Sequence, residues 1–277
     1  MRRSGNRGNV DMKGEKMKIL SIINLKGGVA KTISAVSIAY ILAAERGKKV
    51  LLVDNDKQGN ASKMLNRHGY GRKGIEHIMT ERIPNMAAVI QQTDYKGLDI
   101  IPANMTLINA NLAVQLDQRR PQHDRIKKAL EKVADRYDIC VIDNAPDINI
   151  STINALVASD YVMIPVTIDD FALDGLAELT EQIKNTKEDL NPGLRLLGCF
   201  VTQYATGSDA DRQGSDFLRE MGEPVFTQSI RRSEKVKPAT FARIPVPLYS
   251  TRSAAAADYR KLVTEFLERS GEDGGKV

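Results

Sequence analysis

Residues 24–32 read Asn-Leu-Lys-Gly-Gly-Val-Ala-Lys-Thr and follow directly on the apolar run Lys18-Ile-Leu-Ser-Ile-Ile23. An apolar strand, a glycine turn and a Lys-Thr pair that opens a long helical pattern form the layout of a phosphate-binding loop. Gly27 and Gly28 lack a Cβ atom, so the backbone there can bend tightly and turn its N–H groups toward a phosphate. The stretch therefore predicts a loop that binds phosphate.

The spacing of the charged residues defines which form of phosphate loop this is. The strict pattern G-x-x-x-x-G-K-[ST] would need glycine where the chain has Leu25 and Ala30. The stretch fits the deviant form K-G-G-x-x-K-[ST] instead, with an additional lysine, Lys26, ahead of the glycines. Lys31 supplies a positive charge for the phosphates, and the hydroxyl of Thr32 is a suitable ligand for Mg²⁺.

The composition is that of a soluble, single-domain α/β protein. The chain has 277 residues, of which 42% are hydrophobic and 27% are charged. A net charge of +5 suits a polyanionic partner, although an ordinary soluble surface explains it equally well. Cys140 and Cys199 lie inside apolar runs, which predicts buried, reduced thiols and fits a cytoplasmic protein. No apolar run approaches membrane-spanning length.

Apolar strand patterns alternate with amphipathic helical patterns from residue 18 onward. Strands are predicted at 18–23, 49–54, 98–101, 137–143, 161–166, 195–201 and 224–228. Helices are predicted near 32–46, 105–116, 121–136, 150–158, 171–190, 209–221 and 254–269, with short helices between 60 and 92. This alternation predicts an α/β fold with a doubly wound, mostly parallel sheet and helices on both faces.

The same pattern predicts a single domain with two tails. Residues 1–16 are polar and basic, and we expect them to be a disordered tail. No long linker or internal repeat interrupts 17–270, which we interpret as one domain, and we expect 271–277 to be a frayed end.

Acidic residues follow two of the predicted strands. Asp54 and Asp56 come at the end of one apolar strand, and Asp143 ends another. Ligands of a parallel sheet bind at the carboxyl ends of its strands. A single acid there is often only a helix cap, but two such strands beside a lysine-glycine loop favour carboxylates that hold Mg²⁺ or position a water.

With these pieces placed, the chain resembles the ParA/Soj/MinD group of deviant P-loop ATPases. Three stretches carry the resemblance, namely Lys26-Gly-Gly-Val-Ala-Lys-Thr32, Val53-Asp-Asn-Asp-Lys-Gln-Gly-Asn-Ala61 and Val141-Ile-Asp-Asn-Ala-Pro146. The similarity covers nearly everything from residue 18 to about 267, and within the group it is greatest to the short partition ATPases.

The resemblance implies ATP and Mg²⁺ as ligands and assigns roles to the loop. Lys31 would contact the β- and γ-phosphates, and Lys26 would reach across an ATP-dependent homodimer to the phosphates of the partner. The residues expected to contact the nucleotide are Lys26, Gly27, Gly28, Val29, Ala30, Lys31, Thr32 and Ile33.

The resemblance also assigns the carboxylates. Asp56 would position the attacking water, and Asp54 would support that site. Thr32, Asp143 and Asp54 are assigned to the metal, with Asp143 acting through water. Such roles agree with phosphoryl transfer, which needs mainly positioning and charge neutralisation.

Three residues depart from the family pattern. Ala30 stands where glycine is commoner, and its methyl group fits if φ at that position is negative. Ile33 replaces a hydroxyl residue, and Lys57 replaces a common proline. We therefore expect slow basal hydrolysis.

The segment 227–237 concentrates four cations, Arg231, Arg232, Lys235 and Lys237. In partition ATPases the similar region helps the ATP dimer to bind double-stranded DNA without sequence preference, which requires only basic side chains that grip phosphates. A solvated charged turn is the alternative interpretation.

The predicted function is thus that of an ATP-dependent DNA-partitioning ATPase, which a ParB-like centromere-binding partner triggers and releases from nucleoid DNA. A MinD-like positioning ATPase at a membrane is one alternative. It is disfavoured because the predicted helix at 258–269 carries mixed charge rather than a basic amphipathic face. An ATP-gated DNA-binding regulator that hardly turns over is another.

Overall fold

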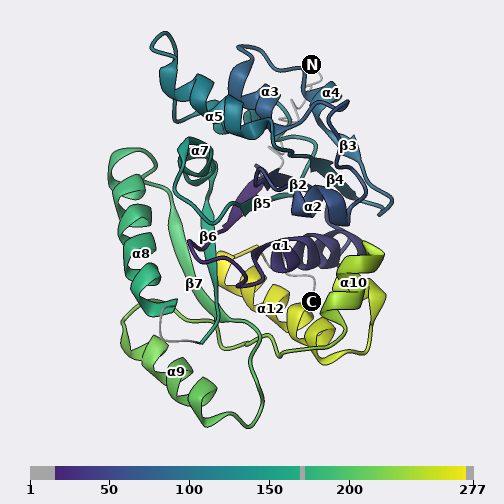
Figure 1. Ribbon diagram of the computed structural model, residues 1–277, viewed down its shortest axis with the longest axis vertical. Helices are drawn as coiled ribbons and strands as arrows, with labels where there is room; N and C mark the ends of the chain where they lie inside the picture. Colours follow the sequence, from purple (N-terminus) through teal and green to yellow (C-terminus); the bar gives the residue numbers. More distant parts are fainter. Residues whose placement is uncertain (1–15, 169–171, 273–277) are drawn as a thin grey trace, which may run out of the picture.

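Seven strands form one sheet in the computed structural model, which describes residues 16–168 and 172–272. The strand order is β3-β4-β2-β5-β1-β6-β7, and only the β3–β4 pair is antiparallel. The strands are β1 (Lys18–Ile22), β2 (Val50–Asn55), β3 (Gln91–Gln92), β4 (Leu98–Ile101), β5 (Ile139–Asn144), β6 (Tyr161–Val166) and β7 (Arg195–Val201). The doubly wound, mostly parallel sheet predicted from the sequence is confirmed (Figure 1).

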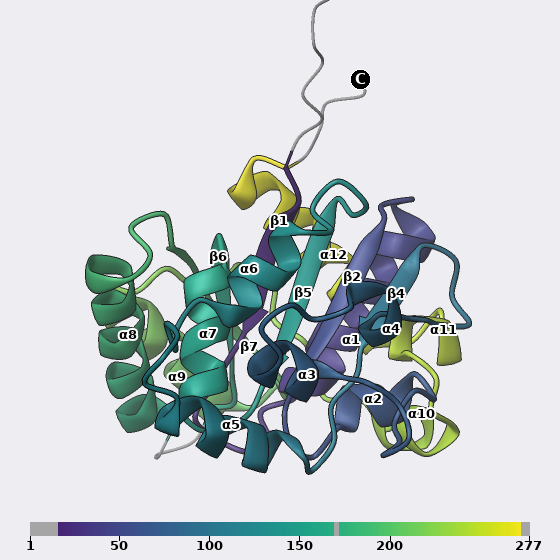
Figure 2. The ribbon, with the colours of Figure 1, turned by 90° about the horizontal axis from the view of Figure 1, so that it is seen from above.

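Helices cover both faces of the sheet (Figures 1 and 2). One face carries α1 (Lys31–Tyr40) with its π-helical continuation (Ile41–Glu45), α2 (Asn60–Met64), α10 (Val236–Ala242), α11 (Val246–Tyr249) and α12 (Ala254–Ser270). The other face carries α3 (Ile75–Thr80), α4 (Met86–Val89), α5 (Leu107–Leu116), α6 (Arg125–Glu131), α7 (Ile150–Ala158), α8 (Ala172–Asp189) and α9 (Asp209–Glu220).

The central strands are buried on both faces, which explains their continuous apolar sequences. Every residue of β2, β5 and β6 is buried. Cys140 and Cys199 are buried and unpaired, as predicted, and burial raises the pKa of the Cys199 thiol to about 12. The apolar core therefore packs against both faces of the sheet, and the polar residues lie at its carboxyl edge.

The predicted strand at 224–228 is wrong. Only Val225 forms an isolated bridge, to Cys199 of β7. The backbone N–H of Phe226 still donates to the carbonyl of Cys199, but those of Thr227 and Gln228 donate to the carboxylate of Glu265 on α12, at 2.8 and 3.0 Å. The segment therefore leaves the sheet edge for the helix layer.

Several boundaries and small elements also differ from the prediction. The helix expected over 121–136 spans only Arg125–Glu131, and the residues before it form a loop. The sequence pattern did not predict β3, α10 or α11, which have only 2, 7 and 4 residues. Elements this short carry too few periodic positions to be recognised.

The two ends of the described chain lie together at the amino edge of the sheet (Figure 2). The ammonium group of Lys18 lies 3.7 Å from the carboxylate of Glu272, and the hydroxyl of Tyr161 donates to the carbonyl of Ser270. The predicted tails fall mostly outside the described residues. Among the described helices, none is long and apolar enough to cross a membrane.

Candidate active site

The phosphate-binding loop predicted from the sequence joins β1 to α1 at the carboxyl edge of the sheet. The side chain of Asn24 fixes its first turn, because Oδ1 accepts from the N–H of Lys26 and Nδ2 donates to the carbonyl of Pro165. Gly28 has a φ of 81° and Ala30 a φ of 63°. The condition under which the methyl of Ala30 would fit without strain is not met, and left-handed backbone at a non-glycine residue costs about 1 kcal/mol.

The end of β7 holds the loop from its other side. The hydroxyl of Thr202 donates to the carbonyl of Val29 at 3.1 Å, and Nε2 of Gln203 donates to the carbonyl of Gly28 at 2.7 Å. These two bonds hold the carbonyls of Val29 and Gly28 against the end of β7. The sequence analysis did not assign a role to Thr202 or Gln203, since nothing local marks a strand end as a contact of a distant loop.

Lys31 points back across the loop. Its ammonium group donates to the carbonyl of Lys26 at 2.8 Å, and the residue is only 8% exposed. Burial lowers the pKa of Lys31, while the carboxylates of Asp143, Asp56 and Asp147 raise it. Lys31 is the first residue of α1, and a helix N-terminus favours an anion. The three carboxylates around its ammonium group would repel that anion, so a metal ion is needed as a counter-ion to complete the site.

Asp143 is the least satisfied of these carboxylates. Both of its side-chain oxygens are buried and have no hydrogen-bond partner among the described residues. Burial raises the pKa of Asp143 well above its usual range and the adjacent charge of Asp54 adds to this, while nearby Thr32 and Lys31 oppose it. A buried carboxylate without a partner is costly, and a cation beside Thr32 would satisfy it.

These residues fit a magnesium ion that is held mainly by substrate phosphates and water. Within residues 16–168 and 172–272, no group of three or more acidic, histidine or cysteine residues is arranged to hold a metal alone. A hydroxyl from Thr32 and an indirect contact from Asp143 suit Mg²⁺, which keeps several of its waters.

Asp54 lies beside Asp143, because the two residues are register partners on the neighbouring strands β2 and β5. One oxygen of Asp54 accepts from the N–H and the hydroxyl of Ser62, at 2.8 and 2.6 Å, and the other accepts from the N–H of Asp56. Burial raises the pKa of Asp54 to about 6, although the bonds from Ser62 oppose this. Asp54 therefore positions the loop that carries Asp56.

Asp56 faces the cavity that the phosphate loop borders. The cavity has a volume of about 540 Å³, and Lys31, Thr32 and Asp56 all line it. The residue is 7% exposed, and its Oδ1 accepts from the N–H of Gln58 at 2.9 Å. The remaining oxygen, Oδ2, accepts no hydrogen bond from the described residues and is available to a water.

Lys26 lies in a different hollow. It lines a neighbouring space of about 350 Å³ together with Thr167, Asp211 and Arg232, and it is not among the residues that line the cavity of Lys31. The two hollows meet at the glycine turn, where Gly27 and Gly28 line both of them, but Lys31 lines only the first and Lys26 only the second.

The basic segment predicted at 231–237 forms the far wall of the cavity. Arg231, Arg232 and Lys237 line it, whereas Lys235 is exposed at its outer side. Arg231 is fixed in place, because its guanidinium donates twice to the carboxylate of Asp258 on α12, at 2.8 Å each. Arg231 therefore anchors the segment to α12, while the other three cations remain on its surface.

Two further contacts join the strand-end loops. The amide of Asn55 on β2 donates to Oδ1 of Asn144 on β5 at 2.9 Å. The ammonium group of Lys57, which replaces the family proline, lies 3.3 Å from the carboxylate of Asp147. Asn55, Lys57 and Asn144 belong to the sequence motifs and Asp147 follows directly on one of them, but the sequence does not show that these side chains meet across the sheet.

Known proteins match this chain over most of its length. The family model described as AAA domain matches residues 17–196. The chromosome partitioning protein ParA of Caulobacter vibrioides is 33% identical over 272 residues, which are 96% of this chain and 100% of that protein. The chromosome-partitioning ATPase Soj of Treponema pallidum is 35% identical over 256 residues, or 92% and 99% of the two chains.

A solved structure agrees with the fold. The structure of cobyrinic acid a,c-diamide synthase from Mycobacterium smegmatis with bound ADP and magnesium superimposes with a TM-score of 0.80 at 27% identity. The match covers 94% of this chain and 98% of the synthase.

Proposed function

This chain belongs to the AAA-domain family of P-loop ATPases that includes ParA and Soj, and from that premise we propose that it partitions DNA at the expense of ATP. The proposal has four parts, which are the binding of Mg²⁺ and ATP, hydrolysis, dimerisation, and release from DNA by a partner. The single observation that carries it is the pairing of a lysine-glycine loop with the unsatisfied, buried carboxylate of Asp143.

ATP binding follows from the loop and the cavity beside it. The backbone N–H groups of the loop and the ammonium group of Lys31 would hold the phosphates, which requires Lys31 to leave the carbonyl of Lys26. The cavity of about 540 Å³ is of the size that small ligands occupy. The ADP and magnesium in the related synthase structure support the same ligands here.

Mg²⁺, held by Thr32 and through water by Asp143, would neutralise charge on the phosphates. Lys31 would stabilise the charge that develops on the transferred phosphoryl group. Asp56, which is held by the loop that Asp54 fixes, would accept a hydrogen bond from the attacking water and orient it. Chemistry of this kind needs positioning rather than a covalent intermediate.

The position of Lys26 supports dimerisation. Lys26 lines a hollow beside the glycine turn and does not line the cavity of Lys31, so it is suited to the phosphates bound by a second copy. A lysine supplied across the interface would link dimer formation to ATP and hydrolysis to dimer dissociation.

DNA binding would use Arg232, Lys235 and Lys237, which are exposed. Since Arg232 and Lys237 also line the nucleotide cavity, ATP binding and DNA binding would influence the same segment. A ParB-like partner would stimulate hydrolysis and release the protein from DNA, and the relatives named for chromosome partitioning support a function of this kind.

Phosphate release and DNA binding together test the proposal. We expect hydrolysis to be slow with ATP and Mg²⁺ alone and faster with DNA and the cognate partner. DNA affinity should require ATP, and each phosphate contact should add about 0.9 to the slope of log affinity against log salt.

A matched pair of variants makes the DNA test specific. Changing Lys235 and Lys237 to Ala should lower the slope by about 1 to 2, because these side chains would grip DNA phosphates. Changing Lys184 and Lys187, which are exposed on α8, should not. ATP-dependent binding to anionic vesicles instead of DNA would favour a membrane-positioning function, and DNA binding without turnover would favour a regulator.

A further inference from the structure

A second cavity lies between the end of α3 and one face of α6, and it shares no lining residue with the nucleotide cavity. Its volume is about 340 Å³. Two carboxylates, Glu81 and Asp124, line it together with six cations: Arg82, Arg119, Arg120, Arg125, Lys128 and Lys132. We call this cavity the basic cleft.

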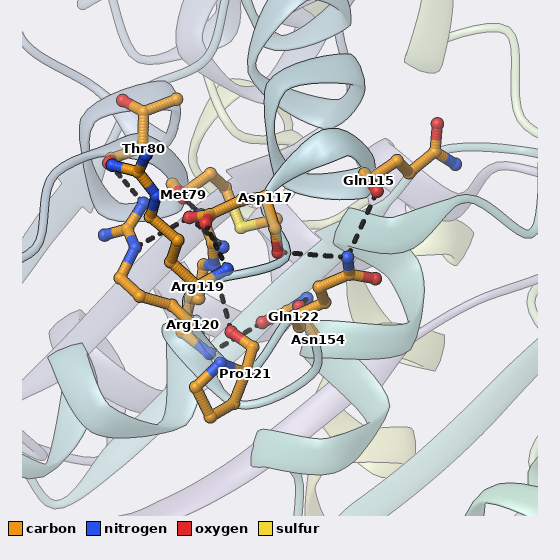
Figure 3. A network of polar contacts seen from close by, with 10 residues as sticks. Met79, Thr80, Gln115, Asp117, Arg119, Arg120, Pro121, Gln122 and Asn154 are labelled. Atoms are coloured by element: carbon orange, nitrogen blue, oxygen red, sulfur yellow. Dashed lines mark hydrogen bonds and ion pairs between the residues drawn. The ribbon is translucent and has the colours of Figure 1, made fainter.

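The floor of the basic cleft is rigid (Figure 3). Oδ2 of Asp117 accepts from Nε of Arg120 at 2.7 Å and from Arg125 at 2.9 Å. Arg120 also donates to the carbonyl of Thr80, and Arg125 donates to the carbonyls of Met79 and Pro121. Two guanidinium groups are thus fixed by one carboxylate and by three backbone carbonyls, those of Met79, Thr80 and Pro121.

The fixed guanidinium groups still have N–H groups to offer. A guanidinium has five N–H donors, and the bonds above use two of Arg120 and three of Arg125. Three donors of Arg120 and two of Arg125 therefore have no partner among the described residues.

The rim of the basic cleft is cationic. Arg82, Arg119 and Lys132 are exposed, and their side chains form no ion pair or hydrogen bond with the part of the chain that the structure describes. Along α6, Arg125, Lys128 and Lys132 follow one another at steps of three and four residues, which places them on one helix face. Lys128 pairs with Asp124 at 2.7 Å, and Asp117 pairs with Arg120 and Arg125, so the six cations face three carboxylates, Glu81, Asp124 and Asp117. The remaining excess of positive charge would be self-repulsive without a counter-ion.

We propose that the basic cleft binds a compact anion with several phosphate groups, such as a polyphosphate or a phosphorylated nucleotide. Fixed, planar guanidinium groups at the floor suit phosphate oxygens, and flexible cations at the rim can close over them. A small anion can reach the floor, where the side chain of Arg125 is only 7% exposed, whereas the backbone of a DNA duplex would stop at the rim. Glu81 and Asp124 at the rim also disfavour a long polyanion.

Titration calorimetry with inorganic tripolyphosphate tests this proposal on the full chain carrying Lys31→Ala, which disables the phosphate loop. We expect saturable binding that persists in this background. Adding Arg119→Ala and Lys132→Ala should weaken it roughly tenfold, because two charge-assisted contacts are lost. Arg119→Lys with Lys132→Arg should restore much of the affinity.

The matched control removes two exposed cations elsewhere, by Lys184→Ala and Lys187→Ala on α8. Unchanged tripolyphosphate affinity in this control supports the site. Equal weakening in both pairs would show a general charge effect and overturn it, as would the absence of saturable binding. If the cleft pair instead weakens only DNA binding, the cleft is part of a nucleic-acid surface and the small-anion proposal fails.

Discussion

The nucleotide cavity and the basic cleft hold their charged groups in opposite ways. In the nucleotide cavity Asp143 is buried with no hydrogen-bond partner, and Lys31 donates only to a backbone carbonyl. In the basic cleft Asp117 bridges two arginines, and its strong hydrogen bonds lower the pKa of that carboxyl to about 2. The nucleotide cavity thus has an unpaired charge at its centre. The basic cleft has paired charges at its floor and unpaired charges at its rim.

The nucleotide cavity and the basic cleft therefore differ in how much each depends on a bound ligand for its stability. Leaving a buried charge unpaired costs more than any surface pair returns, so the nucleotide cavity is completed only by its ligands. The basic cleft keeps its shape without a ligand, because its floor is already satisfied. Ligand binding should therefore change stability strongly at the first region and only modestly at the second.

The largest effect is expected for Lys31→Ala. Loss of the ammonium group should lower ATP affinity by about 100-fold or more, since a buried charge-assisted contact to phosphate is removed. Lys26→Ala should spare ATP binding by the monomer but block the ATP-dependent dimer. Titration with a fluorescent nucleotide measures ATP affinity, and light scattering with ATP and Mg²⁺ measures dimer formation. A Lys26→Ala protein that dimerises normally would remove the cross-dimer role.

Asp56→Ala should slow single-turnover hydrolysis by about 100-fold and weaken ATP binding far less, because a water-orienting contact acts on the transition state. The ATP dimer should accumulate and stay longer on DNA. If Asp56 only caps the following helix, the variant would lose about 1 kcal/mol of stability and keep its turnover. Thermal melts beside the kinetics distinguish these results.

Arg125→Ala tests the paired region. It leaves two carbonyls and the Asp117 carboxylate short of donors, so the free energy of unfolding should fall by about 2 kcal/mol. ATP hydrolysis per folded molecule should stay unchanged. Urea denaturation monitored by circular dichroism gives the stability, and impaired turnover in the folded variant would show that the two regions are not independent.

The pH dependence of stability gives a further test of the unpaired charges in the nucleotide cavity. A carboxyl whose folded-state pKa is raised stabilises the fold fully below its unfolded value and loses that contribution as pH rises through the folded value. Since burial raises the pKa of Asp54 to about 6, the nucleotide-free protein should lose on the order of 1 kcal/mol between pH 4 and 7. Asp54→Asn should flatten this fall, and a melting temperature independent of pH in the parent would contradict it.

The smallest expected effect is that of Ala30→Gly. Glycine adopts a φ of 63° without steric cost, so the loop should gain about 1 kcal/mol. Differential scanning calorimetry without nucleotide measures the gain, and Ala35→Gly within α1 serves as a control that should destabilise. Equal destabilisation by both changes would show that the left-handed loop is not strained.

The sequence predicted the sheet and the loop because both have strong local signals. Strands β5 and β6 are continuous apolar runs, and the loop has its lysines and glycines at fixed spacing. The motif also identified Asp54 and Asp143, but only the strand register shows that they are direct neighbours. That neighbourhood explains why the charge of Asp54 adds to burial in raising the pKa of Asp143.

The parts that were not predicted depend on contacts between distant segments. The bonds from Thr202 and Gln203 to the phosphate loop span more than 170 residues, and the Arg231–Asp258 pair joins a loop to the last helix. The strand expected at 224–228 failed because Glu265 on α12 takes its backbone donors. Local periodicity cannot anticipate such competition.

The two ends of the described chain, near Lys18 and Glu272, lie side by side at the surface. Ends that lie side by side on a surface tolerate circular permutation. A short linker between them would allow new ends to be opened in the loop after β7, at residues 205–208, without lengthening any buried connection. Because the ends of the described chain lie at the amino edge of the sheet, probes attached near them would report on the molecule without touching the phosphate loop (Figure 2).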